Sequence, residues 1–303
     1  MGTPDFSVPV LNALIENFNV IAVVTQPDKK VGRKQVLTPS PVKKVALANK
    51  LEVLQPDKVR GNAEFIRRLK KLSPDLIVVA AYGLILPKEI LDIPKYKVIN
   101  VHASLLPKYR GASPIQAAIL NGDKETGITI MLVNEEMDEG PMLAQKTITI
   151  NDNDNFGSLY NKLSVLGANL LLETLPKYLS GQILSIPQDD SKATYFPKIT
   201  KEMGKIDWHK SASEIERQIR AFTPWPGSFT LWNNKVLKIH KVKYNNNNYN
   251  YNIGEMFKLN EGIGIKCGQG ALEILELQLE GKKPMTDKEF LNGYPKIIGS
   301  ILK

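Results

Sequence analysis

The sequence predicts an α/β protein, in which a doubly wound, mostly parallel β-sheet is followed by a small β-barrel. Its first half alternates β-branched apolar runs with amphipathic helical segments, the order that builds parallel sheets. The run at 75–83, DLIVVAAYG, is almost wholly apolar, as expected of a strand covered on both faces. After Gly181 the pattern changes to short runs interrupted by glycines and asparagines, which favours antiparallel strands.

Each strand of the first part is expected where mainly β-branched residues run together, and each helix where apolar residues recur at a spacing of three or four. The expected strands are 19–26, 75–83, 96–104, 126–134 and 141–150. The expected helices are 6–18, 41–51, 62–72, 113–122 and 156–181, the last of which stops at a glycine.

The segment Gly2-Thr3-Pro4 has the composition of the tight turn that joins the first strand of such a sheet to its first helix. No apolar run precedes this turn in the sequence. Because the strand before the turn would lie in the middle of the sheet, we expect an opening strand, and the true start, upstream of Met1.

The remaining pattern predicts an α/β domain at 1–181, a linker at 182–205 and a β-barrel domain at 206–303. The stretch 185–200 is polar and contains two prolines, as linkers often do. A capped helix is expected at 211–222, and short strands follow from Ser228. An antiparallel sheet that does not close is the alternative to the barrel.

Charge and cysteine content limit the class of function. The net charge of +9 and the pI of about 9.3 indicate a polyanionic partner, although the codon bias of an AT-rich genome, which favours lysine and asparagine, would produce the same excess. The single cysteine, Cys267, excludes an internal disulfide and fits a reducing compartment. With only three histidines as well, we expect no metal site. No signal peptide or membrane helix is expected, so we expect a cytoplasmic protein.

One polar constellation follows the strand that ends near residue 102. Asn100 and His102 are two residues apart and therefore share one face of that strand. Ligands of open α/β sheets bind at the carboxyl ends of strands. An amide and an imidazole placed there can donate hydrogen bonds to an oxygen that becomes negative during a reaction. Asp138 follows a later strand and could orient His102 and favour its protonated form. A packing role for His102 and an acidic turn around Asp138 are the alternatives.

The loop SLLPKYRG follows directly, and Leu105, Leu106 and Pro107 could form a wall for a planar heterocycle. Other catalytic patterns are absent from the sequence, which has no G-x-S-x-G elbow, no G-x-x-x-x-G-K-[ST] and no G-x-G-x-x-G. Cys267 has no histidine near it in sequence and is expected to be a small buried residue.

The segment INVHASLLPKYRGASPIQ, followed by GDKETGITIMLVNEEMDEGPML, resembles the folate-dependent formyltransferases. The pattern is specific, because Asn-x-His, Ser-Leu-Leu-Pro and Asp-x-Gly recur at fixed separations. Further segments such as VVTQPDKKVGRK and IDWHKSASEIERQIRAFTPWPGSF resemble the members that formylate a tRNA-linked amino acid. The resemblance extends from Gly2 to about Gly293, and the missing opening strand is the one clear departure.

This resemblance implies a Rossmann-like first domain and a second domain like the oligonucleotide-binding barrels. It implies that 10-formyltetrahydrofolate donates a formyl group to the α-amino group of methionine on initiator tRNA, in a monomeric bacterial enzyme without a metal. Asn100 and a protonated His102 would stabilise the oxyanion, and Asp138 would support the charge of His102. The residues implied to border the folate are Tyr82, Gly83, Ser104, Leu105, Leu106 and Pro107.

The basic loop at 26–43 carries Lys29, Lys30, Arg33 and Lys34, more cations than a small neutral substrate requires. The resemblance implies that this loop grips the acceptor end of the tRNA; a solvated charged loop is the alternative. Phosphate contacts of this kind give affinity without sequence choice. Further backbone contacts are expected from lysines of the second domain, namely Lys235, Lys238, Lys241, Lys243, Lys282 and Lys283.

Three related activities compete with this interpretation: formylation of glycinamide ribonucleotide, formylation of a nucleotide-linked amino sugar, and hydrolysis or oxidation of formyl-folate within a longer chain. The basic loop and the KKPM segment favour the tRNA substrate. A noncatalytic RNA-binding protein would explain the charge, but it would not need Asn100, His102 and Asp138 together at strand ends.

Overall fold

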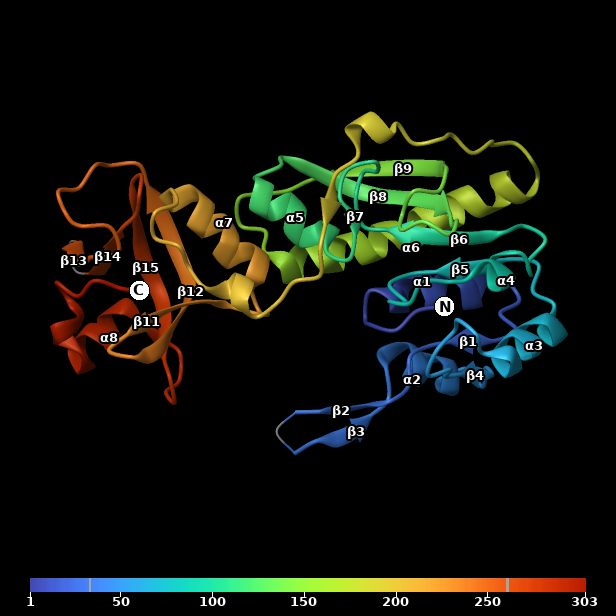
Figure 1. Cartoon of the computed structure of the whole chain (residues 1–303), viewed down its shortest axis with the longest axis horizontal. Helices are drawn as coiled ribbons and strands as arrows, with labels where there is room; N and C mark the ends of the chain where they lie inside the picture. Colours follow the sequence, from blue (N-terminus) through green and yellow to red (C-terminus); the bar gives the residue numbers. More distant parts are fainter. Residues whose placement is uncertain (33, 260–261) are drawn as a thin grey trace. The chain divides into compact units, whose positions relative to one another are not determined.

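The computed structural model describes residues 1–32, 34–259 and 262–303 (Figure 1). The chain divides into two compact units. The first comprises Met1–Pro114, Glu125–Thr149 and Tyr160–Pro197, and the second comprises Ile115–Lys124, Ile150–Leu159 and Lys198–Lys303.

The first unit contains most of the expected α/β elements, usually with shorter bounds than the sequence predicts. Its helices are α1 (Ser7–Asn17), α2 (Pro41–Ala48), α3 (Ala63–Leu72), α4 (Lys88–Leu91), the 3-10 helix η1 (Asp190–Lys192) and most of α6 (Phe156–Leu179). Its strands are β1 (Val23–Val24), β2 (Lys29–Val31), β3 (Val36–Thr38), β4 (Val53–Leu54), β5 (Ile77–Val79), β6 (Val98–His102), β7 (Arg110–Gly111), β8 (Glu125–Leu132), β9 (Met142–Thr149) and β10 (Tyr195–Phe196).

The helix boundaries of this unit follow from local chemistry. The Ser40 side chain accepts a hydrogen bond from the Lys43 amide at the start of α2, where Pro41 occupies the first turn. Asn62 caps α3 in the same way through the Phe65 amide. Glycine closes α6, because Gly181 has a φ of +74° that a side chain would strain.

The central sheet has the order β5-β6-β8-β9. Only β5 and β6 pair in parallel, whereas β8 runs antiparallel to both β6 and β9. The prediction of a mostly parallel sheet is therefore wrong for β8 and β9. The segment joining these two strands, 133–141, is too short for the crossover that a parallel pair needs. A separate parallel pair is formed by β1 and β4.

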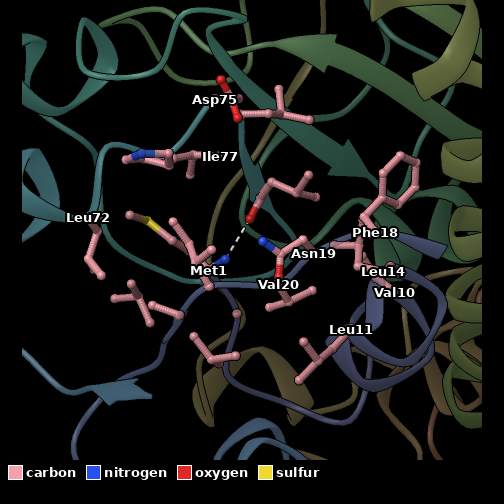
Figure 2. Close-up of a pocket in the computed structure, with 18 of the residues that line it drawn as sticks. Met1, Val10, Leu11, Leu14, Phe18, Asn19, Val20, Leu72, Asp75 and Ile77 are labelled. Carbon is pink, nitrogen blue, oxygen red and sulfur yellow. Dashed lines mark hydrogen bonds between the residues drawn. The ribbon is translucent and has the colours of Figure 1, made fainter. Parts of the chain in front are cut away.

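Met1 and Gly2 lie between these two groups of strands, where Met1 lines a pocket with residues of α1 and β5 (Figure 2). The Met1 amine donates to the Val78 carbonyl at 2.5 Å, and the Gly2 amide donates to the Val24 carbonyl at 3.0 Å. Gly2 also forms a parallel bridge with Ala80. A Cβ on Gly2 would lie 2.7 Å from the Ser7 side chain, so only glycine permits this close approach.

Helix α6 covers one face of the central sheet (Figure 1). A Cβ on Gly167 would lie 2.8 Å from Val101 of β6, so the helix packs closely on that strand. The carboxyl end of β6 emerges from this packed layer, and it carries the predicted site.

The second unit is built on one antiparallel sheet. Its strands are β11 (Ser228–Trp232), β12 (Lys235–Asn245), β13 (Met256–Leu259), β14 (Gly262–Lys266), β15 (Ala271–Leu279) and β16 (Met285–Thr286). Its helices are α5 (Pro114–Asn121), α7 (Ala212–Phe222), α8 (Asp287–Gly293) and the 3-10 helices η2 (Glu202–Gly204) and η3 (Pro295–Ile297).

The strand order is β11-β12-β15-β14-β13, with β16 added to β15. Among the described residues no pairing joins β11 to β13, so the sheet is not seen to close into a barrel. Its core contains Ile215, Leu237, Ile265 and Leu272, none of which is accessible to solvent. Cys267 lies in the same core, and burial raises the pKa of its thiol to about 12, as expected of a structural cysteine.

Candidate active site

Asn100 and His102 stand at the end of β6 and lie on the same face of the strand. In the register with β8, Asn100 is opposite Met131 and His102 is opposite Thr129. Asn100 is half-buried, and His102 is only 6 % exposed. The rigid sheet thus holds both side chains at the edge where ligands of such folds bind.

Asp138 lies beside both residues, although 36 positions separate it from His102. Its Oδ1 atom is 3.6 Å from Nδ1 of His102 and accepts a hydrogen bond of 3.4 Å from the Asn100 amide. The other ring nitrogen, Nε2, is 3.0 Å from the Tyr109 carbonyl oxygen, which can only accept. Oxygen atoms therefore face both ring nitrogens, and an imidazolium would have an acceptor for each N–H.

The Asp138 loop is held by backbone geometry. Asp138 has a φ of +57°, in the left-handed region, and its Oδ2 atom accepts from the Gly111 amide at 2.9 Å. A Cβ on Gly140 would lie 1.8 Å from the Leu132 carbonyl oxygen, so this position requires glycine. The Asp-x-Gly pattern is thus needed for the loop to fold back onto the end of β8.

Hydrogen bonds from the segment predicted to be a linker, 182–205, also hold the Asp138 loop. The Gln188 amide nitrogen donates to the carbonyl oxygens of Asp138 and Gly140, both at 2.8 Å. The Gln188 amide oxygen accepts from Nε of Arg110 at 3.0 Å. Gln188 therefore connects Arg110 to the backbone on both sides of Glu139.

Arg110 is 1 % exposed, and polar side chains surround its guanidinium. It donates to Asp190 at 2.6 Å and to the Tyr195 hydroxyl at 2.9 Å, and it lies 3.3 Å from Glu139. Burial alone would lower the pKa of Arg110, but the hydrogen bonds with Asp190 and Tyr195 outweigh it and raise the pKa. The Arg-Gly pair after the Pro107 loop was the sequence signal that could have indicated this role.

The loop predicted to border a folate is firmly anchored. Ser104 and Leu106 are buried, whereas Leu105 and Pro107 keep part of their surface exposed. The Thr129 hydroxyl donates to the Ser104 carbonyl at 2.7 Å and accepts from the Leu106 amide at 3.1 Å. Leu105 and Pro107 are therefore the two side chains of this loop that can touch a ligand.

Tyr82 and Gly83 lie in an irregular segment that follows β5. Tyr82 is 1 % exposed and lies in an apolar cluster, so of these two residues only the exposed Gly83 is available to a ligand. Burial raises the pKa of Tyr82 to about 12. The carbonyl of Tyr82 accepts from the Gln26 amide at 2.8 Å, and Gly83 has a φ of +80°.

The basic loop is a β-hairpin of β2 and β3, a pairing that the sequence analysis did not predict (Figure 1). Lys29, Lys30 and Lys34 are exposed on it, and Lys29 donates to Gln26 at 2.7 Å. Arg33, the fourth predicted cation, lies outside the described residues. Val31, Val36 and Leu37 on the same hairpin are all more than half exposed.

No group of histidine, cysteine and acidic residues suited to a metal ion occurs among the described residues. No helix in the described part of the chain is long and apolar enough to cross a membrane.

Known proteins resemble this chain along almost its whole length. The chain matches the formyl transferase family over residues 1–175 and the formyl transferase C-terminal domain over residues 198–295. It is 52% identical over 307 residues to the methionyl-tRNA formyltransferase of Caldicellulosiruptor saccharolyticus, covering 100% of this chain and 98% of that one. It is 48% identical over 305 residues to the enzyme of the same name from Bacillus subtilis, covering 100% and 96%.

Solved structures show the same fold at lower identity. A sugar 3N-formyl transferase, WlaRD, studied with dTDP and 5-N-formyl-tetrahydrofolate, has a TM-score of 0.68 at 23% identity and covers 93% of this chain and 97% of its own. The N-formyltransferase of Helicobacter canadensis, in complex with folinic acid and dTDP-3-aminofucose, also has a TM-score of 0.68, at 24% identity and with 90% and 96% covered. The chain belongs to the formyl transferase family, with both its N-terminal and its C-terminal domains.

Proposed function

We propose that this protein transfers the formyl group of 10-formyltetrahydrofolate to the α-amino group of methionine on initiator methionyl-tRNA. The product, N-formylmethionyl-tRNA, then serves translation initiation. The observation that carries this proposal is identity near 50% along the whole chain to bacterial enzymes named methionyl-tRNA formyltransferase. The bacterial relatives and the tRNA substrate together support a bacterial, cytoplasmic enzyme, and we infer that it acts as a monomer.

In the proposed reaction the methionine amine attacks the formyl carbon and the carbonyl oxygen becomes an oxyanion. Asn100 has a second amide hydrogen to donate to that oxygen. His102 lies on the same face of β6 and, when protonated, would stabilise the oxyanion by its charge, because both of its ring nitrogens face the oxygen atoms of Tyr109 and Asp138. The attacking amine loses a proton, and we assign its acceptance to the Asp138 carboxylate, which lies beside Asn100 and His102. The bond from the formyl carbon to N10 then breaks, and N10 takes up a proton, so atoms and charge balance.

The formyl donor would lie along the loop at Ser104–Pro107 and the segment at Tyr82 and Gly83. The exposed parts of Leu105 and Pro107 suit the face of a planar ring, and the backbone at Gly83 suits its polar edge. Ser104 and Leu106 are buried and would support this wall from behind. Two relatives of the same fold were solved with formylated folates, which supports such a donor here.

The acceptor tRNA would be held by the hairpin of β2 and β3 and by the second domain. We infer that residues 1–181 form the catalytic domain, 182–205 the connection and 206–303 a small tRNA-binding barrel. The exposed lysines that support this are Lys235, Lys238, Lys241, Lys243, Lys282 and Lys283. Replacing Lys29, Lys30 and Lys34 by alanine should reduce the salt dependence of tRNA binding, whereas Lys70→Ala on α3 should not.

The decisive experiment measures formyl transfer from 10-formyltetrahydrofolate to charged initiator tRNA for the wild type and His102→Ala. The variant should lose about 10²–10³ in turnover and keep its tRNA affinity. His209→Ala is the matched control, because His209 is exposed and its ring bonds to Asp207 alone among the described residues. A wild type that binds tRNA without turnover would indicate a binding module. Formyl transfer to a nucleotide-linked amino sugar instead of tRNA would refute methionyl-tRNA as the acceptor.

A further inference from the structure

The loop that would border the formyl donor is bonded to one face of β8 and β9, which are neighbours in the central sheet (Figure 1). Thr129 of β8 is opposite Gln145 of β9 in the register of this antiparallel pair, so their side chains share a face. Gly127, two residues before Thr129, lies on the same face and is opposite Thr147. The face therefore presents two cross-strand pairs, one with polar side chains on both strands and one with a glycine.

Gly127 fixes where Leu105 can lie. A Cβ on Gly127 would be 2.6 Å from Cδ2 of Leu105 and 2.1 Å from the Lys146 carbonyl oxygen, so this position requires glycine. The Leu105 side chain therefore packs directly on the backbone of β8 and keeps only part of its surface exposed.

The Thr129 hydroxyl is the polar anchor of the loop. Thr129 is inaccessible to solvent, and its hydroxyl donates to the Ser104 carbonyl at 2.7 Å and accepts from the Leu106 amide at 3.1 Å. A hydroxyl has one hydrogen to donate and two lone pairs that accept, so one further donor can bond to it.

Gln145 supplies that donor from an exposed position of β9. Its amide nitrogen donates to the Thr129 hydroxyl at 2.9 Å and to the Leu106 carbonyl at 2.8 Å. Both amide hydrogens are thereby used, and the Thr129 hydroxyl has all the partners that it can take. Leu106 is thus fixed at both of its backbone groups, between Leu105 and Pro107, the two residues that keep exposed surface for a ligand.

We propose that Gln145 is a positioning residue that sets the affinity of the site for its formylated folate donor. It acts through Leu106 and Thr129 and not on the reacting atoms. Leu105 and Pro107 would contact the ring of the donor equally in the ground state and the transition state. Their displacement should therefore weaken donor binding more than it slows the chemical step. This inference rests on the proposed function, because the loop must border a folate.

The test measures binding of 5-formyltetrahydrofolate by titration calorimetry without tRNA, and formyl transfer from 10-formyltetrahydrofolate to charged initiator tRNA. Gln145→Met keeps the length of the side chain and removes both donated hydrogen bonds. Because water can replace part of them at an exposed position, the Kd for the folate and the KM for the donor should rise about 5- to 10-fold. The kcat and the KM for tRNA should stay within about twofold, and the thermal midpoint within about 2 °C.

Two lysine variants separate hydrogen-bond donation from charge. Gln145→Lys keeps a donor for the Leu106 carbonyl and should bind the folate within about twofold of the wild type. Thr147→Lys adds the same charge two residues along the same face, where Thr147 is exposed and its side chain has no hydrogen bond in the described part of the chain. Thr147→Lys should leave folate affinity unchanged, and it should not restore the affinity of Gln145→Met when the two changes are combined.

The possible outcomes distinguish this inference from the proposed function. A Gln145→Met enzyme that binds 5-formyltetrahydrofolate as tightly as the wild type overturns the inference and leaves the proposed function intact. A fall in kcat as large as the rise in KM also overturns it, because Gln145 would then act on the chemical step. Restored affinity in the combined Gln145→Met and Thr147→Lys enzyme overturns it as well, since charge alone would suffice. A wild type that neither binds the folate nor transfers a formyl group refutes the proposed function, and the inference with it.

Discussion

Replacing Gln188 by alanine tests whether this side chain holds the Asp138 loop in its position beside His102. The side chain makes three hydrogen bonds, to the carbonyls of Asp138 and Gly140 and with Nε of Arg110. At about 1 kcal/mol for each neutral bond and more for the bond to the guanidinium, the loss of stability is roughly 3 kcal/mol. Because Gln188 is half-buried, water can reach its position in the variant and replace part of the lost hydrogen bonding.

The kinetic effect follows from the backbone of Asp138. Its φ of +57° is uncommon for a residue other than glycine and persists where the surrounding contacts fix it. Without Gln188 the carbonyls on both sides of Glu139 lose their donor, and the carboxylate can move from its place beside His102. Because a displacement of about 1 Å can cost about 10²-fold, we expect kcat to fall 10- to 100-fold with the KM for tRNA nearly unchanged.

Two further variants separate positioning from simple destabilisation. Gln188→Glu keeps an acceptor for Arg110 but loses both donated bonds, so its kcat should fall as far as that of Gln188→Ala. Ser191→Ala in the same segment removes only an exposed contact with Asp189 and should leave kcat unchanged. Initial rates are measured at least 15 °C below each unfolding midpoint. A Gln188→Ala enzyme with kcat within twofold of the wild type would refute the reasoning.

Three other changes have defined outcomes. Gly140→Ala places a Cβ 1.8 Å from the Leu132 carbonyl oxygen, so both activity and the thermal midpoint should fall sharply; an unchanged midpoint by circular dichroism would contradict this. Tyr82→Phe removes a buried hydroxyl that has no hydrogen-bond partner in the described part of the chain, so urea unfolding should show equal stability or a gain of about 1 kcal/mol. The Met1 amine has a pKa lowered from 8.0 to about 5, so the unfolded state binds more protons between these values and stability should rise with pH from 5 to 8, by at most about 4 kcal/mol. Acetylation of the amine, in protein whose mass shows that Met1 is retained, should abolish this rise.

The sequence was sufficient for elements whose signal is local. Caps and apolar spacing located α2 and α3 within a few residues, and the two-residue spacing of Asn100 and His102 placed both on one strand face. The direction of a strand relative to its neighbours could not be predicted from such local signals. An apolar run such as 126–134 reads the same whether its neighbour is parallel or antiparallel, and only the short connection to β9 carries that information. Tyr82 was placed beside the folate by the family resemblance alone, and its local sequence does not indicate that its ring packs into the core.

The segment at 185–197 shows that a polar stretch of sequence can be either a solvated linker or a set of partners for a buried charge. Its glutamine, aspartates and tyrosine suggested a solvated linker, yet Gln188, Asp190 and Tyr195 all bond to Arg110, which is almost completely buried. A guanidinium removed from water is tolerated only where acceptors surround it, and β6 and its loop do not supply enough of them. The chain must therefore bring back a polar segment from beyond α6, and the pairing of β10 with β7 fixes where it returns. The same contacts place Gln188 against Asp138, so the need to neutralise one buried cation also determines the position of the proposed catalytic carboxylate.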